Sequence, residues 1–285
     1  HNCLTALTKI LCLKSRNIAD VRQEILNQTV KGFENVLPHV LNGFDLAVDD
    51  LEDDGVEMPE VISTVDLPEE ISGQGENSTG FYWPAENMIA VNTPLVRDNP
   101  SALSYAFLGE ESAHWLREHY NPDSVILDGM ELPENPYEIP PHQLEQKMQE
   151  MEEEIQRMED YSRFEAVDEF FGGIGSRIAS HAAGEKPNDL SPGESSDQVI
   201  TEYTPEEFRD RILDPEAGIA ALADGNLYAI RDGIVHMTGY RAAKQNFEEA
   251  LEDDELIRKS SEQIHSEYDI DQHELDVIKE IYEFS

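Results

Sequence analysis

An excess of acidic side chains, spread along the whole chain, limits the conditions under which this sequence can form a compact fold. Asp and Glu number 61 against 20 Lys and Arg, which gives a formal net charge of -41. A soluble domain usually carries a net charge of about 2–8 in magnitude, so self-repulsion should destabilise the compact state at low ionic strength. At about 1 M salt the screening length falls to roughly 3 Å, and most of this repulsion disappears.

Dispersed acid of this kind is typical of proteins that work in concentrated salt. We therefore expect the chain to come from a halophilic archaeon or its virus, and to be located in the high-salt cytoplasm or in the virus particle. The competing interpretations are a low-affinity cation buffer and a nucleic-acid mimic, which usually concentrate acid in low-complexity runs. Here 39% of the residues are hydrophobic and no such run stands out, which favours the halophilic protein.

The same charge argues against direct nucleic-acid binding, because phosphate contacts need a basic surface. The longest apolar stretch, Leu4 to Leu13, is too short to cross a bilayer, so we expect no membrane span. Cys3 and Cys12 are the only cysteines, and their spacing matches no metal motif. We expect the partners to be other proteins.

Apolar residues at helical spacing predict a mainly helical α+β fold. One long helix or two are expected over 17–48, followed by an acidic turn over 49–59. Another helix is expected from Asn99-Pro100 to about Tyr120, with Asn as the cap and Pro in the first position. The β-branched segment 230–235 is expected to be a strand.

The pattern divides the chain into a principal domain over 1–183, a linker over 184–203 and a mainly helical C-terminal region over 204–285. Within the first part, the helix 142–160 carries apolar residues at alternating spacings of four and three. These residues are Leu144, Met148, Met151, Ile155 and Met158. They either pack on the protein's own core or form a coiled coil with another protein, a contact to which methionine adapts well.

Residues 80–120 combine a predicted hairpin with a helix that carries an incomplete metal motif. Two strands over 80–92 are joined by a turn near Pro84. The helix that follows contains Glu110-Glu111-Ser112-Ala113-His114, one residue short of the zinc-peptidase motif H-E-x-x-H. Glu110 and His114 occupy the two ligand positions, four residues apart on one helical face, and Glu111 occupies the position of the general base.

In these elements the chain resembles the zincin metallopeptidases, in particular those whose third ligand is a glutamate on the following helix. The resemblance covers roughly residues 17–181. It implies a zincin-like fold, in which a small edge-strand sheet over 81–92 is packed on the active-site helix over 107–116. It also implies a third ligand within 164–171, where a glutamate precedes small residues and an aromatic pair. Glu165 is the favoured ligand and Glu169 the alternative.

The departure from the family motif changes the expected chemistry. Glu110, His114 and Glu165 would supply one imidazole and two carboxylates, a harder set than that of zinc peptidases and closer to the preference of manganese or calcium. We therefore expect no cofactor, with zinc or manganese as the alternative. His119, His181 or His236 could replace the missing histidine if the fold brings it in, although His119 lies on a different helical face from His114.

Two functions of different classes follow from this pattern. The first is a non-catalytic zincin-like structural or interaction protein of a halophile, such as a virus-particle component, with the Leu144–Met158 helix as a contact. The second is an active metal-dependent peptidase or hydrolase in which Glu111 is the general base and the backbone of 88–92 pairs with an extended peptide. The missing ligand favours the first, because a fold alone does not determine a function.

Overall fold

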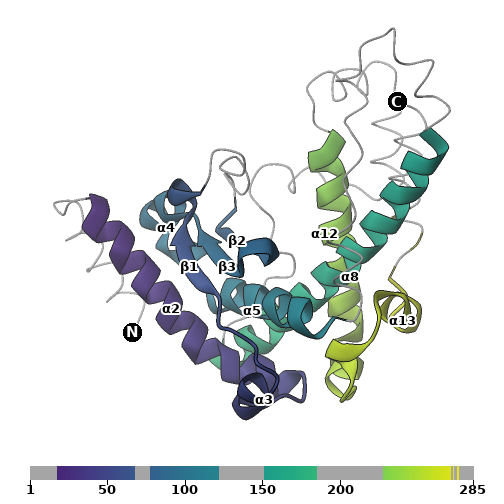
Figure 1. Ribbon diagram of the computed structural model, residues 1–285, viewed down its shortest axis with the longest axis horizontal. Helices are drawn as coiled ribbons and strands as arrows, with labels where there is room; N and C mark the ends of the chain where they lie inside the picture. The colour runs from purple at the N-terminus through teal and green to yellow at the C-terminus, as the bar shows by residue number, and fades with distance from the viewer. Residues whose placement is uncertain are drawn as a thin grey trace, which may run out of the picture.

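The computed structural model describes residues 18–67, 78–121, 151–184 and 227–270, together with residues 272 and 275. In these parts the fold is mainly helical, with one small three-stranded sheet (Figure 1). This confirms the predicted mainly helical α+β class. Both cysteines and most of the predicted linker lie outside the described residues.

The N-terminal part is one long helix, α2 (Ile18–Gly43), which continues through Pro38. Its buried face follows helical spacing, with Val21, Ile25, Phe33 and Val40 among the buried residues. The acidic segment that follows is not all turn, because 48–53 form the short helix α3 (Val48–Asp53). The prediction of a turn from residue 49 is wrong there, since Leu51 is buried and ties this segment to the core.

The sheet has the order β1-β3-β2 and contains the predicted hairpin. Strands β2 (Gly80–Trp83) and β3 (Met88–Val91) are antiparallel, and Asn87 closes the turn between them in the left-handed region at φ 46°. Strand β1 (Glu60–Ser63) pairs in parallel with β3. Because β3 is central and paired on both sides, the prediction that its backbone binds a peptide is wrong; β2 is an edge strand.

Two helices follow the hairpin where one was predicted. Asn92 caps α4 (Thr93–Asp98) by accepting a hydrogen bond from the Leu95 amide, and Pro100 opens a 3₁₀ turn (Pro100–Ala102). Helix α5 (Tyr105–Tyr120) begins only at the next effective cap, where Ser104 accepts from the Phe107 amide. The predicted start at Asn99 is wrong because Asn99 makes no side-chain cap.

The remaining described chain consists of α8 (Met151–Ala183), α12 (Leu227–Leu251), a 3₁₀ turn (Leu256–Arg258) and α13 (Ser261–Glu267). Segment 230–235 lies within α12, so the predicted strand is wrong. Ile234 and Val235 are buried, and packing of α12 on α8 decides the conformation in place of β-propensity. The two long helices cross each other in the view of Figure 1 and are packed together.

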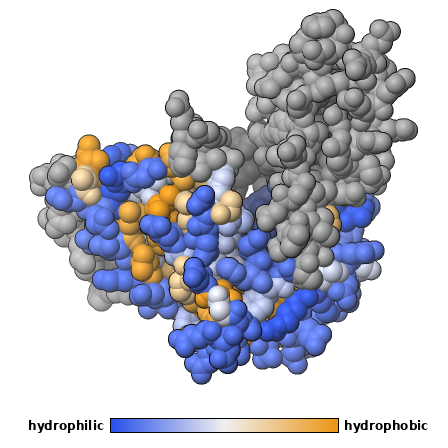
Figure 2. Space-filling model, in the orientation of Figure 1, coloured by the Kyte–Doolittle hydropathy of each residue, from blue (hydrophilic) through white to orange (hydrophobic). Residues whose placement is uncertain are grey.

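One hydrophobic cluster runs through the described residues from α2 to residue 275. The described parts on the two sides of the predicted linker share this cluster, while the domain boundaries themselves stay a prediction. Figure 2 shows a mostly hydrophilic surface, interrupted by hydrophobic residues on the side where the sheet lies. No helix in the described ranges combines the length and apolar character needed to traverse a bilayer.

A close crossing of α5 and α8 sets the geometry of the site. A Cβ at Gly109 would lie 2.3 Å from the Gly175 carbonyl oxygen, and a Cβ at Gly175 would lie 2.3 Å from the Gly109 carbonyl oxygen. The two backbones therefore touch where neither residue has a side chain. Glu110 directly follows Gly109, and Gly172, one turn before Gly175, lies against the side chains of Glu110 and His114.

Candidate metal centre

Three side chains from three helices converge in the described structure. Glu110 of α5, Glu169 of α8 and His236 of α12 each offer one ligand atom, and these atoms all lie within 4.8 Å of one another. Carboxylate oxygen and imidazole nitrogen are the donors that first-row divalent cations accept in proteins. The side chains of His236 and Glu169 are 30% and 25% exposed, so the cluster is half-buried, although the Glu169 Oε2 atom that faces His236 is itself covered.

The structure brings only part of the predicted ligand set together. Glu110 and the alternative third ligand Glu169 lie in the cluster, while the favoured ligand Glu165 lies one helical turn earlier on α8 and outside it. His114 also lies outside the converging set, although it is an immediate neighbour of it. The predicted set of Glu110, His114 and Glu165 is therefore not the set whose donor atoms meet.

His236 supplies the imidazole of the converging set, whereas His114 of the α5 motif does not. His236 was one of three histidines that could substitute, and the sequence contained no signal to choose it. It directly follows the segment 230–235 that was predicted as a strand, and it is far from Glu110 in the chain. Only the packing of α12 on α8 brings it to the site, with its Nδ1 atom 2.7 Å from Oε2 of Glu169.

Burial and neighbouring charges shift the pKa values of Glu110 and Glu169 in opposite directions. Burial raises the pKa of Glu110, and the nearby Glu169 raises it further, against the opposite effects of His236 and His114. Burial also raises the pKa of Glu169, but the charge and hydrogen bond of His236, with the charge of His114, lower it below its usual value overall. The charged form of Glu169 is thus favoured, whereas the charged form of Glu110 is disfavoured.

His114 is oriented by a carboxylate of α8. Its Nδ1 atom lies 2.9 Å from Oδ2 of Asp168, and its Nε2 edge lies over Gly172, where a Cβ would be 2.6 Å from Nε2. Burial lowers the pKa of His114, but Asp168, Glu169 and nearby Glu111 outweigh this and raise it well above 6.5. Asp168 therefore holds the His114 imidazole beside the three converging ligands, and the surrounding carboxylates favour its cationic form.

Glu111 is the most buried acid at the site, with 4% of the residue exposed. It accepts a hydrogen bond from the backbone of Tyr82 in the edge strand β2, while its Oε2 atom has no hydrogen-bond partner in the described structure. Burial and the adjacent Glu110 raise its pKa to about 8. A buried carboxyl group with a free oxygen and a pKa near neutrality is a common mark of a functional site.

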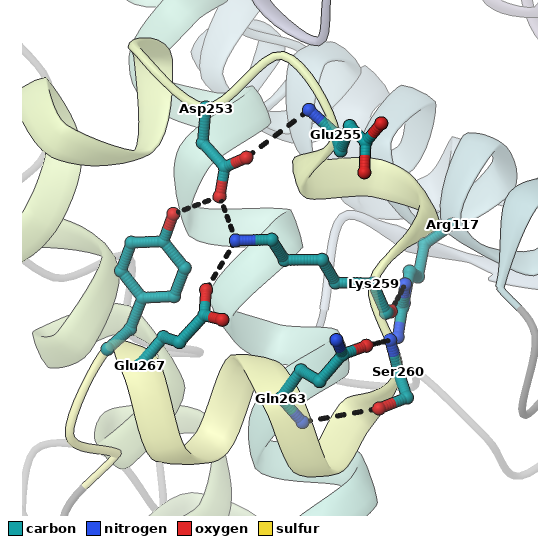
Figure 3. Close-up of polar contacts among 8 residues, drawn as sticks. Arg117, Asp253, Glu255, Lys259, Ser260, Gln263 and Glu267 are labelled. Carbon is teal, nitrogen blue, oxygen red and sulfur yellow. Dashed lines mark hydrogen bonds and ion pairs between the residues drawn. The ribbon is translucent and has the colours of Figure 1, made fainter.

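A polar clasp holds the segment after α12 against α5 (Figure 3). Buried Arg117 donates from Nη1 to the carbonyl oxygens of Ile257 and Lys259, at 2.9 and 2.7 Å, and its guanidinium lies 4.5 Å from the centre of the Phe171 ring. Asp253 binds Lys259 at 2.6 Å and accepts from the Tyr268 hydroxyl at 2.7 Å. The helix that carries His236 is thereby tied to the helix that carries Glu110.

Comparisons with protein-family models, with curated proteins and with solved structures find no match for this chain. The interpretation of the centre therefore depends on its geometry and chemistry.

Proposed function

We propose that the protein is a zincin-like, metal-dependent hydrolase whose cation is held by Glu110, Glu169 and His236. The observation that carries the proposal is the convergence of these three ligand atoms within 4.8 Å. Three protein ligands with further positions left open are typical of catalytic metal sites, whereas structural sites are closed by four. The partial exposure of Glu169 and His236 supports access for water and substrate.

The donor set suits a divalent cation of intermediate hardness. Two carboxylates and one imidazole fit manganese at least as well as zinc. A cation bound there would supply Lewis acidity to the reaction.

Two residues of α5 have the positions needed for proton transfer and charge stabilisation. In its ionised form Glu111 can accept a proton from an attacking water through its free oxygen, since the Tyr82 backbone holds its carboxylate in place. The His114 imidazole, fixed by Asp168, presents positive charge beside Glu110 and can stabilise an anionic oxygen as it develops.

A peptide is the substrate class that the sheet supports. Strand β2 lies at an edge of the sheet among the described strands, and its Tyr82 backbone touches Glu111. An extended chain added along an edge strand gains backbone hydrogen bonds. A peptide bound along β2 would therefore pass next to the candidate base.

Metal content is the first test. The full chain, purified in molar KCl without chelators, should carry about one equivalent of manganese or zinc by inductively coupled plasma mass spectrometry. The variants Glu169→Gln and His236→Ala should lose it, while Glu248→Gln, which changes an exposed glutamate of α12, should retain it. Wild-type protein that binds neither ion after dialysis against each would disprove the proposal.

Hydrolysis is the second test, made on metal-loaded protein with a mixture of fluorogenic peptides. Glu111→Gln should keep the metal and lose at least about 100-fold in rate, the scale of a lost general base. If no peptide is cleaved although the metal is bound, the result favours the second candidate, a non-catalytic interaction protein. That candidate is supported by apolar side chains on the surface, with Met58 50% and Val65 55% exposed.

The contact surface predicted on the Leu144–Met158 helix lies outside the residues whose side chains the structure describes. Helix α8 begins at Met151.

A further inference from the structure

One side chain joins two of the candidate ligands and belongs to no motif in the sequence. Tyr240 lies one helical turn after His236 on α12, so the two side chains share one face. Their rings stack with centroids 4.4 Å apart and planes inclined by 22°. Tyr240 is only 5% exposed, and this stacking limits the planes that the His236 ring can take.

The hydroxyl group of Tyr240 faces the acidic residues of α5. It lies against the Glu110 carboxylate, with Glu169 and Glu111 also close enough to act on its charge. It makes no hydrogen bond of good geometry in the described structure, and a buried hydroxyl without one is costly. The Glu110 carboxylate is the acceptor against which this O–H lies.

We propose that Tyr240 is the positioning residue of the metal centre: its ring fixes His236 by stacking, and its hydroxyl donates to Glu110 and orients that carboxylate toward the cation. The inference depends on the proposed function, because it assumes that Glu110, Glu169 and His236 bind a cation. Tyr240 would then link the ligand of α12 to the ligand of α5. Partners that orient metal ligands typically contribute about 10–100-fold to metal affinity.

The test is a titration of the full-length protein with Co²⁺ in molar KCl, followed by visible absorption, which reports both affinity and coordination geometry. Tyr240→Phe keeps the stacking and removes the hydroxyl, so its dissociation constant should rise about 10-fold or more, with a shifted absorption spectrum at saturation. Tyr240→Leu also removes the stacking and should weaken binding further. The matched control is Tyr268→Phe, which removes another largely buried hydroxyl, the one that donates to Asp253 at 2.7 Å.

The outcomes separate this inference from the proposed function. If the wild-type protein gives no Co²⁺ spectrum, the metal centre itself is wrong. If the wild-type protein binds and Tyr240→Phe binds equally well with the same spectrum, the role of Tyr240 is wrong while the centre stands. A loss of affinity that Tyr268→Phe reproduces, or one without any spectral change, indicates general destabilisation and also overturns the inference.

Discussion

The Nδ1 atom of His236 lies 2.7 Å from a carboxylate oxygen of Glu169, which joins α12 to α8 at the candidate metal centre. The same helix α8 carries Glu165 one turn earlier, outside the converging set. We expect Glu169→Gln to abolish binding of one equivalent of metal and Glu165→Gln to leave it unchanged. Isothermal titration with Mn²⁺ measures both. Equal losses in the two variants would show that the acidic face as a whole, and not a defined ligand, attracts the cation.

Replacement of Gly172 should impair the site without unfolding the protein. A Cβ there would lie 2.6 Å from Nε2 and 2.8 Å from Cε1 of His114, so the imidazole would have to move. We expect the free energy of unfolding of Gly172→Ala to lie within about 1 kcal/mol of the wild-type value, because alanine favours the helix. The rate of peptide cleavage should fall about 100-fold, as for other small displacements in active sites.

Gly109→Ala is the informative comparison for Gly172→Ala. Its Cβ would meet the Gly175 carbonyl oxygen at 2.3 Å, which is backbone and cannot move aside. We expect a loss of about 3 kcal/mol in the free energy of unfolding by urea, the upper part of the usual range for overpacking. Full activity of Gly172→Ala would show that the position of His114 is unimportant for the reaction.

Arg117 should stabilise the fold through the C-terminal clasp. Arg117→Met would leave the carbonyl oxygens of Ile257 and Lys259 without their donor, and we expect a loss of about 3 kcal/mol, because hydrogen bonds to charged groups are each worth about 1.5–3 kcal/mol. The control Arg258→Met alters an exposed arginine that lies 5.0 Å from the centre of the Tyr120 ring, and should cost less than about 1 kcal/mol. Urea denaturation in molar KCl measures both. Equal losses would contradict the role of Arg117.

Local patterns predicted the hairpin and the helical class well, because each depends on neighbouring residues. The turn at Pro84 to Asn87 and the two strands around it match the structure, and the buried face of α2 follows its helical spacing. The start of α5 was misplaced because Asn99-Pro100 resembles a cap and first turn, while Ser104 provides the working cap. Sequence patterns indicate several possible N-cap residues, and tertiary packing decides at which of them the helix begins.

The candidate site could be predicted only in part, for the same reason. Glu110, Glu111 and His114 stand out because their spacing follows one helix. His236 and Tyr240 do not, because they reach the site through the packing of α12 on α8. The choice of Glu165 over Glu169 depended on a resemblance in local sequence, whereas the structure aligns Glu169 with His236. The two glutamates are one helical turn apart on the same helix, and local sequence alone does not show which of them faces His236.

The fold as a whole should depend on salt. With a net charge of -41, we expect the protein to lose its helical circular dichroism below about 0.5 M KCl and to regain it near 2 M, because screening weakens as salt falls. The same titration in NaCl should give a similar midpoint if screening is the cause. Full helicity in dilute buffer would contradict the halophilic interpretation and favour the acidic cation-binding alternative.

Asp253 provides a pH test that can be separated from this general charge effect. Burial raises its pKa, but hydrogen bonds from Lys259, Tyr268 and the Glu255 amide outweigh that and lower the pKa below its usual value. A carboxyl group with a lowered folded-state pKa contributes stability that is present above its unfolded pKa of about 3.9 and is lost as the pH falls through the folded value. Wild-type protein should therefore be more stable than Asp253→Asn at pH 7, and this difference should shrink below about pH 4.

The comparison of these two proteins cancels the acidic residues that they share. As the pH changes, the charge repulsion among all other carboxylates changes equally in wild type and in Asp253→Asn. The difference between their free energies of unfolding therefore reports on the clasp alone. Urea denaturation at pH 7, 5 and 3 in 2 M KCl measures it, with exposed Asp254→Asn as the matched control that should show little difference at any pH. A gap between wild type and Asp253→Asn that stays constant from pH 7 to pH 3 would mean that the charge of Asp253 does not stabilise the turn after α12.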